Sequence, residues 1–215
     1  MSLPLDVNDD FAPWVDQLES VTLSRRNSGE VVAIAAALRR HAVTKEAETS
    51  GGAARQADAV WHLQLPVGES APELGDVVID ARDRRWTIQQ TEELPLLGRW
   101  KCSARELRVA FGCDDRVDVQ RAVWDDLGEG PVIVDWSFVY TALPVRIQPE
   151  ETTISGSLDS PTSVARFTII LGEAFSLEPD DRFVAADGAI YRLETIEQTD
   201  RIDALPIARV IRVSS

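Results

Sequence analysis

Two histidines and two cysteines have the widest chemical scope of any side chains in this sequence, so their spacing is considered first. His41 and His62 lie far apart, and neither sits at the ligand spacing that zinc sites use. His62 follows Trp61 in an alternating segment, which predicts a half-exposed strand histidine and not a ligand or base. Cys102 and Cys113 belong to no C-x-x-C pattern, which favours free thiols in a reducing cytosol over a structural bridge.

Acidic residues occur as adjacent pairs, which raises the question of carboxylate catalysis or metal binding. Neighbouring residues on a strand point to opposite faces, so such a doublet does not form a catalytic pair. Residues 180–188 contain acids and a glycine but lack the alternating oxygen ligands of a calcium loop. The doublets are Asp9-Asp10, Asp114-Asp115, Asp125-Asp126, Glu150-Glu151 and Asp180-Asp181.

The sequence patterns of a serine nucleophile elbow, a phosphate-binding loop and a dinucleotide site are absent. Gly51-Gly52 stands alone, without a strand before it and a helix start after it. We therefore expect a protein that is not an enzyme, and we assign no catalytic, cofactor-binding or metal-binding residues. A hydrolase built on acidic residues, whose carboxylates would have to converge from separate elements, is the least favoured function.

The chain of 215 residues is long enough for one medium domain or two small ones. Its net charge is −14, and the two halves share it unequally: residues 1–110 hold 13 basic and 17 acidic side chains, and residues 111–215 hold 9 and 19. Nucleic-acid binding requires a basic footprint, so we expect no nucleic-acid partner. The acidic surface fits solubility or a basic protein partner.

No apolar run of the sequence approaches the roughly 20 residues that cross a bilayer. The first ten residues are acidic and lack both the basic leader and the apolar stretch of a signal peptide. We therefore expect a cytoplasmic protein that does not associate with membranes.

The sequence is internally repeated: residues 60–93 fall on residues 165–198 without a gap, at a spacing of about 105 positions, and the alternation of side chains is kept. Such a repeat indicates two copies of one small domain in tandem, the first in residues 1–112 and the second in residues 113–215. The matched segments are Glu73–Asp76 with Glu178–Asp181, Val78-Ile79 with Phe183-Val184, Trp86–Ile88 with Tyr191–Leu193, Arg105–Val109 with Arg209–Val213, and Trp14 and Asp16 with Trp124 and Asp126.

The apolar period is mostly two, and each copy has about six short strands separated by turn signals, which is typical of a small all-β barrel or sandwich. Val31–Leu38 would also suit a helix, but its counterpart Tyr140–Pro149 contains two prolines, so we predict a strand in both copies. Short helices are predicted before each copy, over residues 8–19 and 119–126.

Each copy is also predicted to contain one hairpin and one closing strand. In the second hairpin, Asp187-Gly188 supplies the preferred two-residue turn. Two long polar loops, residues 42–58 and 150–163, are candidates for subunit contacts. The hairpins pair Asp76–Ala81 with Arg85–Thr91 and Arg182–Ala186 with Ala189–Ile196, and the closing strands are Trp100–Phe111 and Leu205–Val213.

Six tryptophans are many for a chain of this length. Most fall at alternating strand positions or in the predicted helices, which core packing explains. An exposed tryptophan would anchor an interface, where this residue is enriched. The six are Trp14, Trp61, Trp86, Trp100, Trp124 and Trp136.

The second copy resembles the head–tail adaptor proteins of tailed bacteriophages, also called stopper or head-closure proteins. In that family, an extended segment with the pattern a-R-I-x-p and a hairpin with the pattern D-r-hydrophobic…d-G-x-x-Y-x-V frame a small β-barrel. The matching segments here are Thr141–Pro149, which contains Arg146-Ile147, Glu178–Asp181 with the strand that follows it, and Asp187–Leu193.

The first copy keeps this pattern more loosely, through Gly75–Ile79 and Asp83–Ile88, with Trp86 in place of the tyrosine. Leu38-Arg39-Arg40 is a faint counterpart of the Arg-Ile segment. Family members usually carry one such domain, so the tandem pair departs from the family pattern.

The resemblance implies a structural, non-enzymatic component of a phage or prophage virion neck. Copies would form a ring beneath the portal, seal the DNA channel and dock the tail. The implied partners are therefore further copies of the chain, portal or connector proteins and tail proteins. The alternative is a monomeric or dimeric binding module of tandem β-barrels, unrelated to virions, with a protein or small-molecule ligand. The native mass distinguishes the two, because a ring needs many copies.

Overall fold

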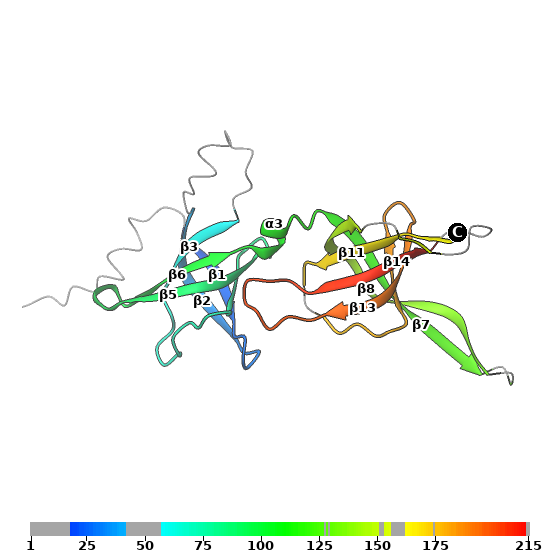
Figure 1. The fold of residues 1–215 in the computed structure, drawn as a ribbon. Helices are drawn as coiled ribbons and strands as arrows, with labels where there is room; N and C mark the ends of the chain where they lie inside the picture. The colour runs from blue at the N-terminus through cyan, green and yellow to red at the C-terminus, as the bar shows by residue number, and fades with distance from the viewer. Residues whose placement is uncertain are drawn as a thin grey trace, which may run out of the picture. The chain divides into compact units, whose positions relative to one another are not determined.

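The computed structural model describes residues 18–41, 57–126, 128, 130–150, 153–155, 162–173 and 175–213 (Figure 1). These residues form an almost entirely β-stranded protein, as predicted. The chain divides into two compact units, Met1–Ala110 with Arg201–Asp203, and Phe111–Asp200 with Ala204–Ser215. The boundary predicted after residue 112 lies two residues beyond this division.

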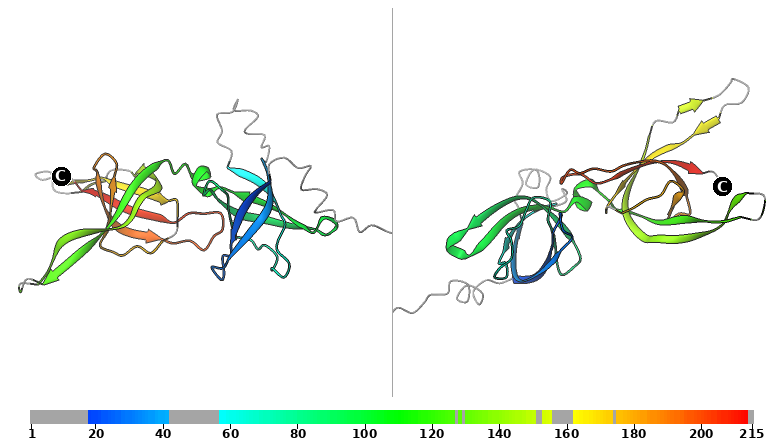
Figure 2. Two further views of the ribbon diagram at one scale, coloured as in Figure 1. Left: turned by 180° about the vertical axis from the view of Figure 1, so that it is seen from behind. Right: turned by 90° about the horizontal axis from the view of Figure 1, so that it is seen from below.

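The first unit contains a closed antiparallel barrel of six strands (Figure 2). The order around the barrel is β1-β2-β3-β6-β5-β4, and the pairing of β1 with β4 closes it. A short 3-10 turn, η2 (Pro95–Leu97), lies between β5 and β6. The strands are β1 (Leu18–Ser24), β2 (Val31–His41), β3 (Asp58–Leu63), β4 (Val77–Ile79), β5 (Arg85–Leu94) and β6 (Arg99–Arg105).

The second unit contains a barrel with the same strand order, β7-β8-β11-β14-β13-β12, closed by the pairing of β7 with β12. Two further strands, β9 (Thr153–Ser155) and β10 (Thr162–Val164), form a separate two-stranded sheet. The prediction of two tandem β-domains of six strands each is thus confirmed. The barrel strands are β7 (Asp115–Asp126), β8 (Pro131–Pro149), β11 (Arg166–Leu171), β12 (Asp181–Ala185), β13 (Ile190–Glu197) and β14 (Ile207–Val213).

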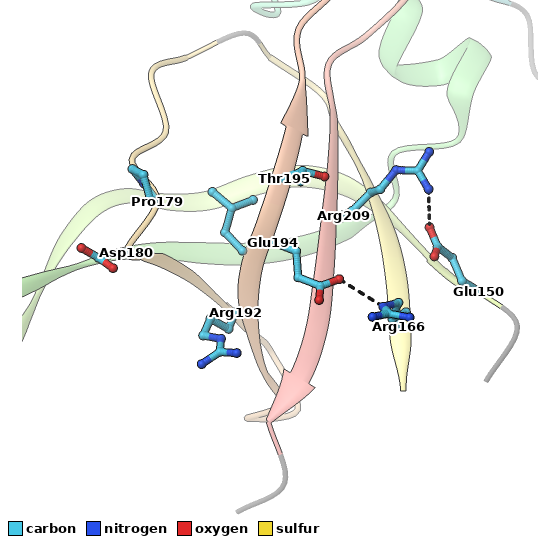
Figure 3. A pocket seen from close by; sticks show the side chains of 9 residues that line it. Glu150, Arg166, Pro179, Asp180, Arg192, Glu194, Thr195 and Arg209 are labelled. Atoms are coloured by element: carbon cyan, nitrogen blue, oxygen red, sulfur yellow. Dashed lines mark hydrogen bonds and ion pairs between the residues drawn. The ribbon is translucent and has the colours of Figure 1, made fainter. Parts of the chain in front are cut away.

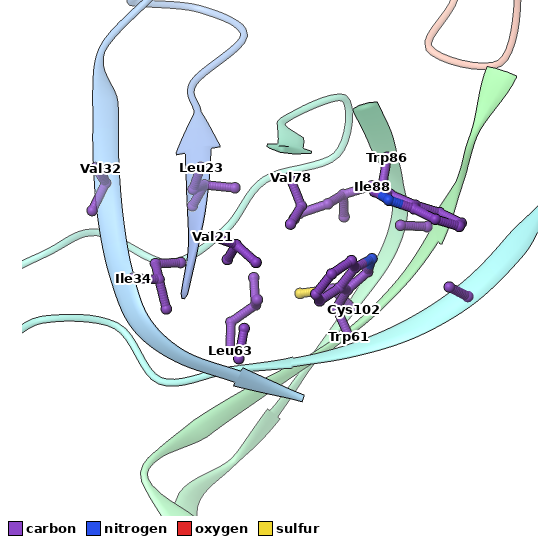
Figure 4. Packing of buried hydrophobic residues seen from close by; sticks show 13 residues of the cluster. Val21, Leu23, Val32, Ile34, Trp61, Leu63, Val78, Trp86, Ile88 and Cys102 are labelled. Atoms are coloured by element: carbon purple, nitrogen blue, oxygen red, sulfur yellow. The ribbon is translucent and has the colours of Figure 1, made fainter. Parts of the chain in front are cut away.

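Each barrel has its own apolar core, built from alternate strand residues. In the first core, the fully buried Trp61 and Trp86 meet edge to face with their ring centroids 6.0 Å apart (Figure 4). In the second, Phe183 is fully buried, and the ring centroids of Phe167 and Tyr191 lie 5.2 Å apart. Such aromatic pairs contribute beyond the area that they bury.

The turn from β12 to β13 differs from the prediction. The N–H of Gly188 donates to the carbonyl of Ala185 (2.9 Å), and the N–H of Ala185 donates to the carbonyl of Ala189 (2.9 Å). The connection therefore has three residues, so the predicted two-residue turn at Asp187-Gly188 is wrong. The glycine supplies the positive φ, 85°, that the last position of such a three-residue turn needs.

The first barrel makes the same turn at the matching positions between β4 and β5. The N–H of Asp83 donates to the carbonyl of Asp80 (2.9 Å), and the N–H of Asp80 donates to the carbonyl of Arg84 (3.1 Å). Asp83 adopts the positive φ, 60°, that Gly188 adopts in the second copy. The two turns are 105 residues apart, as in the sequence match.

A buried aspartate immediately before β4 ties the first barrel together where it closes. The carboxylate of Asp76 accepts hydrogen bonds from the N–H groups of Glu73 (2.9 Å) and Arg26 (3.0 Å) and from the Arg25 guanidinium (3.0 Å). Arg25 directly follows β1, so this ion pair extends the seam between β1 and β4.

The second barrel repeats this arrangement at Asp181, the first residue of β12. Its carboxylate accepts hydrogen bonds from the N–H of Glu178 (2.7 Å) and from Nε and Nη2 of Arg121 (2.8 and 2.9 Å). Asp181 faces Arg121 directly across the closing pair of strands, β7 and β12. The two copies therefore close with the same buried aspartate and the same partner type.

The structure corrects the predicted helices. The helix predicted over residues 119–126 is wrong, because this segment belongs to β7. Of the helix predicted over residues 8–19, residues 8–17 lie outside the described part of the chain and residues 18–19 belong to β1. The first closing strand ends at Arg105, and a short helix, α3 (Leu107–Phe111), follows it.

The gapless sequence match also fails for the third strand. The strand pairings make Ile169 the counterpart of Trp61, a spacing of 108 and not 105, because both lie beside equivalent residues, Ala208 and Cys102. The two spacings differ by three positions. Because three is an odd number, the gapless match aligns residues that point into one barrel with residues that point out of the other. Since Ala208 matches Cys102, the match of Arg105–Val109 with Arg209–Val213 is wrong as well.

The two long loops that were predicted have different outcomes. The first, residues 42–58, lies outside the described residues up to residue 56, and residue 58 begins β3. The second, residues 150–163, contains β9 and the start of β10 and is therefore not a plain loop. Among the described residues, no helix has the length and apolar character needed to span a bilayer.

The two aspartates allow a test of what closes each barrel. We expect Asp76→Ala to cost the first barrel about 3–5 kcal/mol, because it leaves the Arg25 side chain, only 8% exposed, without its counter-ion. Asp181→Ala should cost the second barrel less, because Arg121 is 30% exposed and can turn to water. Denaturant-dependent hydrogen exchange reads the two barrels separately.

The control for this pair is Asp58→Ala, which removes the exposed ion pair of Asp58 with Arg105. Exposed pairs contribute about 0–1 kcal/mol, so little change is expected. Equal losses for Asp76→Ala and Asp181→Ala would contradict the importance of arginine burial.

Candidate functional site

The most distinctive surface of the described structure is a hairpin formed by the ends of β7 and β8 (Figure 1). The neighbouring strands do not extend along it: β12 pairs with β7 only over residues 117–121, and β11 pairs with β8 only over residues 145–149. Residues 122–126 and 131–139, here called the arm, therefore pair in the sheet only with residues of β7 and β8. The outer backbone edges of the arm are open to another strand.

The arm is apolar on both faces. Trp124 is 48% exposed and Phe138 is 62% exposed. Consecutive residues of a strand point to opposite faces, so the run from Val132 to Val134 places apolar side chains on each. The large exposed apolar side chains of the arm are Val123, Trp124, Val132, Ile133, Val134, Phe138 and Val139.

The arm is also acidic. Residues 122–139 contain four acidic side chains and no lysine, arginine or histidine. Asp125, Asp126 and Asp135 are among them and are exposed. A partner for this surface would therefore combine apolar and basic groups.

The base of the arm is held firmly to the barrel. The Arg182 guanidinium lies 3.6 Å from the centroid of the Trp136 ring, and its Nε donates to Oε1 of Gln120 (2.9 Å). Burial lowers the pKa of Arg182 from its usual value. Ala142 has a positive φ of 54°, and its N–H donates to the carboxylate of Asp118 (2.8 Å). Bulges in the β7–β8 pairing add the local bend and twist that such irregularities bring.

The matching hairpin of the first barrel is short. β1 ends at Ser24 and β2 begins at Val31, and the N–H of Arg25 donates to the carbonyl of Glu30 (2.8 Å). The arm is thus a feature of the second copy. The sequence signal for it was the apolar run of residues 131–140, which has no counterpart in the first copy.

An open cleft of about 800 Å³ lies on the wall of the second barrel (Figure 3). Its charged side chains largely neutralise one another: Arg166 pairs with Glu194 (3.3 Å), and Arg209 pairs with Glu150 (3.6 Å). Arg192 also lines the cleft. The lining residues are Glu150, Arg166, Pro179, Asp180, Arg192, Leu193, Glu194, Thr195 and Arg209.

In the first barrel, Asp80 is the centre of a polar cluster. Its buried carboxylate accepts hydrogen bonds from the Arg39 and Arg84 guanidinium groups (2.9 and 2.8 Å), from the Trp86 indole (3.3 Å) and from the N–H groups of Arg82 and Arg84 (2.9 and 3.0 Å). Burial alone would raise the pKa of Asp80, but these hydrogen bonds outweigh it and hold the pKa below its usual value. Both oxygens of the Asp80 carboxylate thus accept hydrogen bonds, and we assign the cluster a role in stabilising the barrel.

The histidines and cysteines take the places expected of structural residues. His62 lies on β3, is partly buried, and has its pKa lowered by burial and by Arg40 and Lys101. His41 ends β2, and its side chain is not among those described. Neither cysteine forms a disulfide, as predicted, and both are buried. Burial together with the charge of Asp76 raises the pKa of Cys102 to about 12.

The carboxylate doublets that the structure describes are not brought together with one another into a site. Asp180 is exposed and Asp181 is buried, in line with strand alternation. Asp114-Asp115 and Asp125-Asp126 are exposed, whereas Asp9-Asp10 and Glu151 lie outside the described residues. Across the described part of the chain, no group of three or more His, Cys, Asp or Glu side chains is placed to hold a metal ion.

The tryptophans divide between core and surface. Trp61 and Trp86 are core residues, Trp100 and Trp136 are partly buried, and Trp124 is exposed on the arm. The sixth, Trp14, lies outside the described residues. The exposed tryptophan that would anchor an interface is thus Trp124.

Comparison with known proteins found no protein-family model that matches the sequence and no curated protein with significant similarity to it.

The low pKa of Asp80 leads to a pH prediction. Because the folded-state pKa is depressed, the carboxylate stabilises the fold above its unfolded-state pKa, and this stabilisation is lost as the pH falls through the folded-state pKa. Asp80→Asn should therefore destabilise the first barrel at pH 7 by about 1–3 kcal/mol, and by progressively less as the pH falls below about 4. Denaturant unfolding at both pH values measures this, with the exposed Asp83→Asn as control. A loss of unfolding free energy that is the same at pH 7 as at a pH below about 4 would refute the stabilising role of the Asp80 carboxylate.

The buried thiols lead to a second prediction. Cys102 and Cys113 should resist a water-soluble thiol reagent in the folded protein, because the reactive thiolate is suppressed and the sulfur is covered. Both should react promptly in denaturant. A Cys113→Ser variant isolates the signal of Cys102, and native labelling of that variant at the rate of an exposed thiol would contradict the burial.

Proposed function

We propose that this protein is a non-enzymatic assembly protein of the head–tail connector type, from a phage or prophage, which self-associates in a ring and joins the portal side of a head to a tail. The observation that carries the proposal is the arm. At the usual sizes of its side chains, the exposed apolar area of the two faces together amounts to roughly 600 Å², so each face carries apolar area that a partner could cover.

The family resemblance supports the proposal through the barrel. Thr141–Pro149 lies within β8, and the hairpin that contains Tyr191 joins β12 to β13, so the matched segments are wall elements. They account for a shared framework. Assembly is assigned to the arm, which lies outside those segments.

Charge supports a role beside a DNA channel. With a net charge of −14, the protein repels the phosphate backbone, so DNA would pass it without being held. The proposed partners are further copies, portal or connector proteins and tail proteins. The proposed locations are the cytoplasm before assembly and the virion after it.

The cleft of the second barrel supports the alternative, a tandem β-barrel binding module. Its open shape and mixed charges suit a small polar ligand or a charged peptide segment. In that case the protein would stay monomeric or dimeric, and ligand binding would respond to substitution of Arg192 in the cleft.

The native mass tests the proposal. Light scattering on the purified protein should give a multiple of the 23.7 kDa chain mass that corresponds to many copies. Trp124→Ser with Phe138→Ser, the arm variant, should shift the mass towards that of one chain, because it removes the two largest exposed apolar groups of the arm.

Val67→Ser is the matched control, since it removes a fully exposed apolar side chain far from the arm in the sequence and should leave the mass unchanged. Circular dichroism checks that each variant is folded. A wild-type protein that stays monomeric at high concentration would refute the assembly function and favour the binding module.

A further inference from the structure

The charges of the arm restrict the surface on which it can dock. Contact between the arms of two copies would bring together two sets of acidic side chains, which include Asp125, Asp126 and Asp135, with no basic residue between them. Like charges placed opposite one another across paired strands destabilise the pairing. A symmetric arm-to-arm contact is therefore disfavoured.

The first barrel carries a larger share of basic groups. Its described residues, 18–41 and 57–110, hold 11 basic and 11 acidic side chains, whereas the described residues from 111 to 213 hold 9 and 16. Four arginines lie at or beside Asp80: Arg39 and Arg84 bond to its carboxylate, Arg82 belongs to the same turn, and Arg85 follows that turn in the chain. These residues, here called the arginine rim, are Arg39, Arg82, Arg84 and Arg85.

Two members of the rim face solvent. Arg82 and Arg85 are exposed, and their guanidinium groups form no ion pair with another described residue. Among the acids beside them, Asp80 is engaged by Arg39 and Arg84, Glu19 pairs with Arg39 at 3.8 Å, and Glu106 is buried. Asp83 is exposed. The rim therefore presents cations that the arm could neutralise.

We propose that the arm of one copy docks on the arginine rim of the first barrel of the next copy. This inference rests on the proposed function, because it specifies how the copies associate. The contact is heterologous: each chain gives an arm to one neighbour and a rim to the other. Repetition of such a contact closes a ring or extends a filament, according to its rotation.

The chain itself contains a contact of the proposed kind. At the base of the arm, the Arg182 guanidinium stacks 3.6 Å from the centroid of the Trp136 ring. Arginine stems also cover apolar surface while the charged end stays hydrated. Rim arginines would thus stack on Trp124 and Phe138 while pairing with the acids beside them. Raised salt should weaken the assembly by about tenfold or more.

A mixing experiment tests the docking. Two variants are prepared: the arm variant, and a rim variant with Arg82→Glu and Arg85→Glu. Each alone should be monomeric in sedimentation analysis. An equimolar mixture should form a one-to-one dimer and nothing larger, because one chain supplies an intact rim and the other an intact arm. Arg212→Glu, a charge reversal at an exposed residue of β14 in the second barrel, should assemble like the wild type.

The outcomes separate this inference from the proposed function. A rim variant that assembles like the wild type, or a mixture that stays monomeric, would overturn the arm-to-rim contact while self-association of the wild type stands. A wild-type protein that never assembles would overturn both. Circular dichroism and tryptophan fluorescence confirm that the variants are folded before the masses are compared.

Discussion

The fold depends on how each barrel is closed. A barrel of six strands exists only if its first and fourth strands pair, and in the first copy that pairing covers just three residue pairs. A carboxylate beside each seam, Asp76 or Asp181, accepts hydrogen bonds from a backbone N–H and from an arginine that lies in the first strand or directly after it. Without its partner, a buried charge of this kind costs several kcal/mol. Both barrels thus close in the same way.

A closed barrel has no free strand edges, so a strand of another chain cannot pair with its wall. The second copy restores such an edge by extending β7 and β8 beyond the wall, whereas the first keeps a short turn, and its described residues carry equal numbers of basic and acidic side chains. The two barrels therefore carry different surfaces on one framework: an acidic, apolar arm and an arginine rim. Two unlike surfaces on one chain are what head-to-tail association requires.

Much of the framework could be predicted from the sequence, because strand alternation and turn residues are local signals. The fourth and fifth strands lie almost where they were predicted. The alanine-rich Val31–Leu38 is a strand, as its proline-containing counterpart had indicated. The sequence match misaligns the third strands of the two copies by three positions. The connection from Leu63 to Asp76 is three residues longer than that from Leu171 to Asp181, and a loop has no periodic pattern that would reveal the difference. The arm could not be predicted, because an exposed strand that is apolar on both faces has the same sequence pattern as a buried strand.

The assembly that we propose requires the arm to be buried against another copy. Hydrogen exchange of the arm amides, residues 131–139, compared between concentrated and dilute protein, tests this most directly. We expect these amides to become strongly protected in the concentrated sample, together with the turn around Arg82. Unchanged exchange in the arm, with protection that appears instead in residues 42–58 or 150–163, would contradict the account.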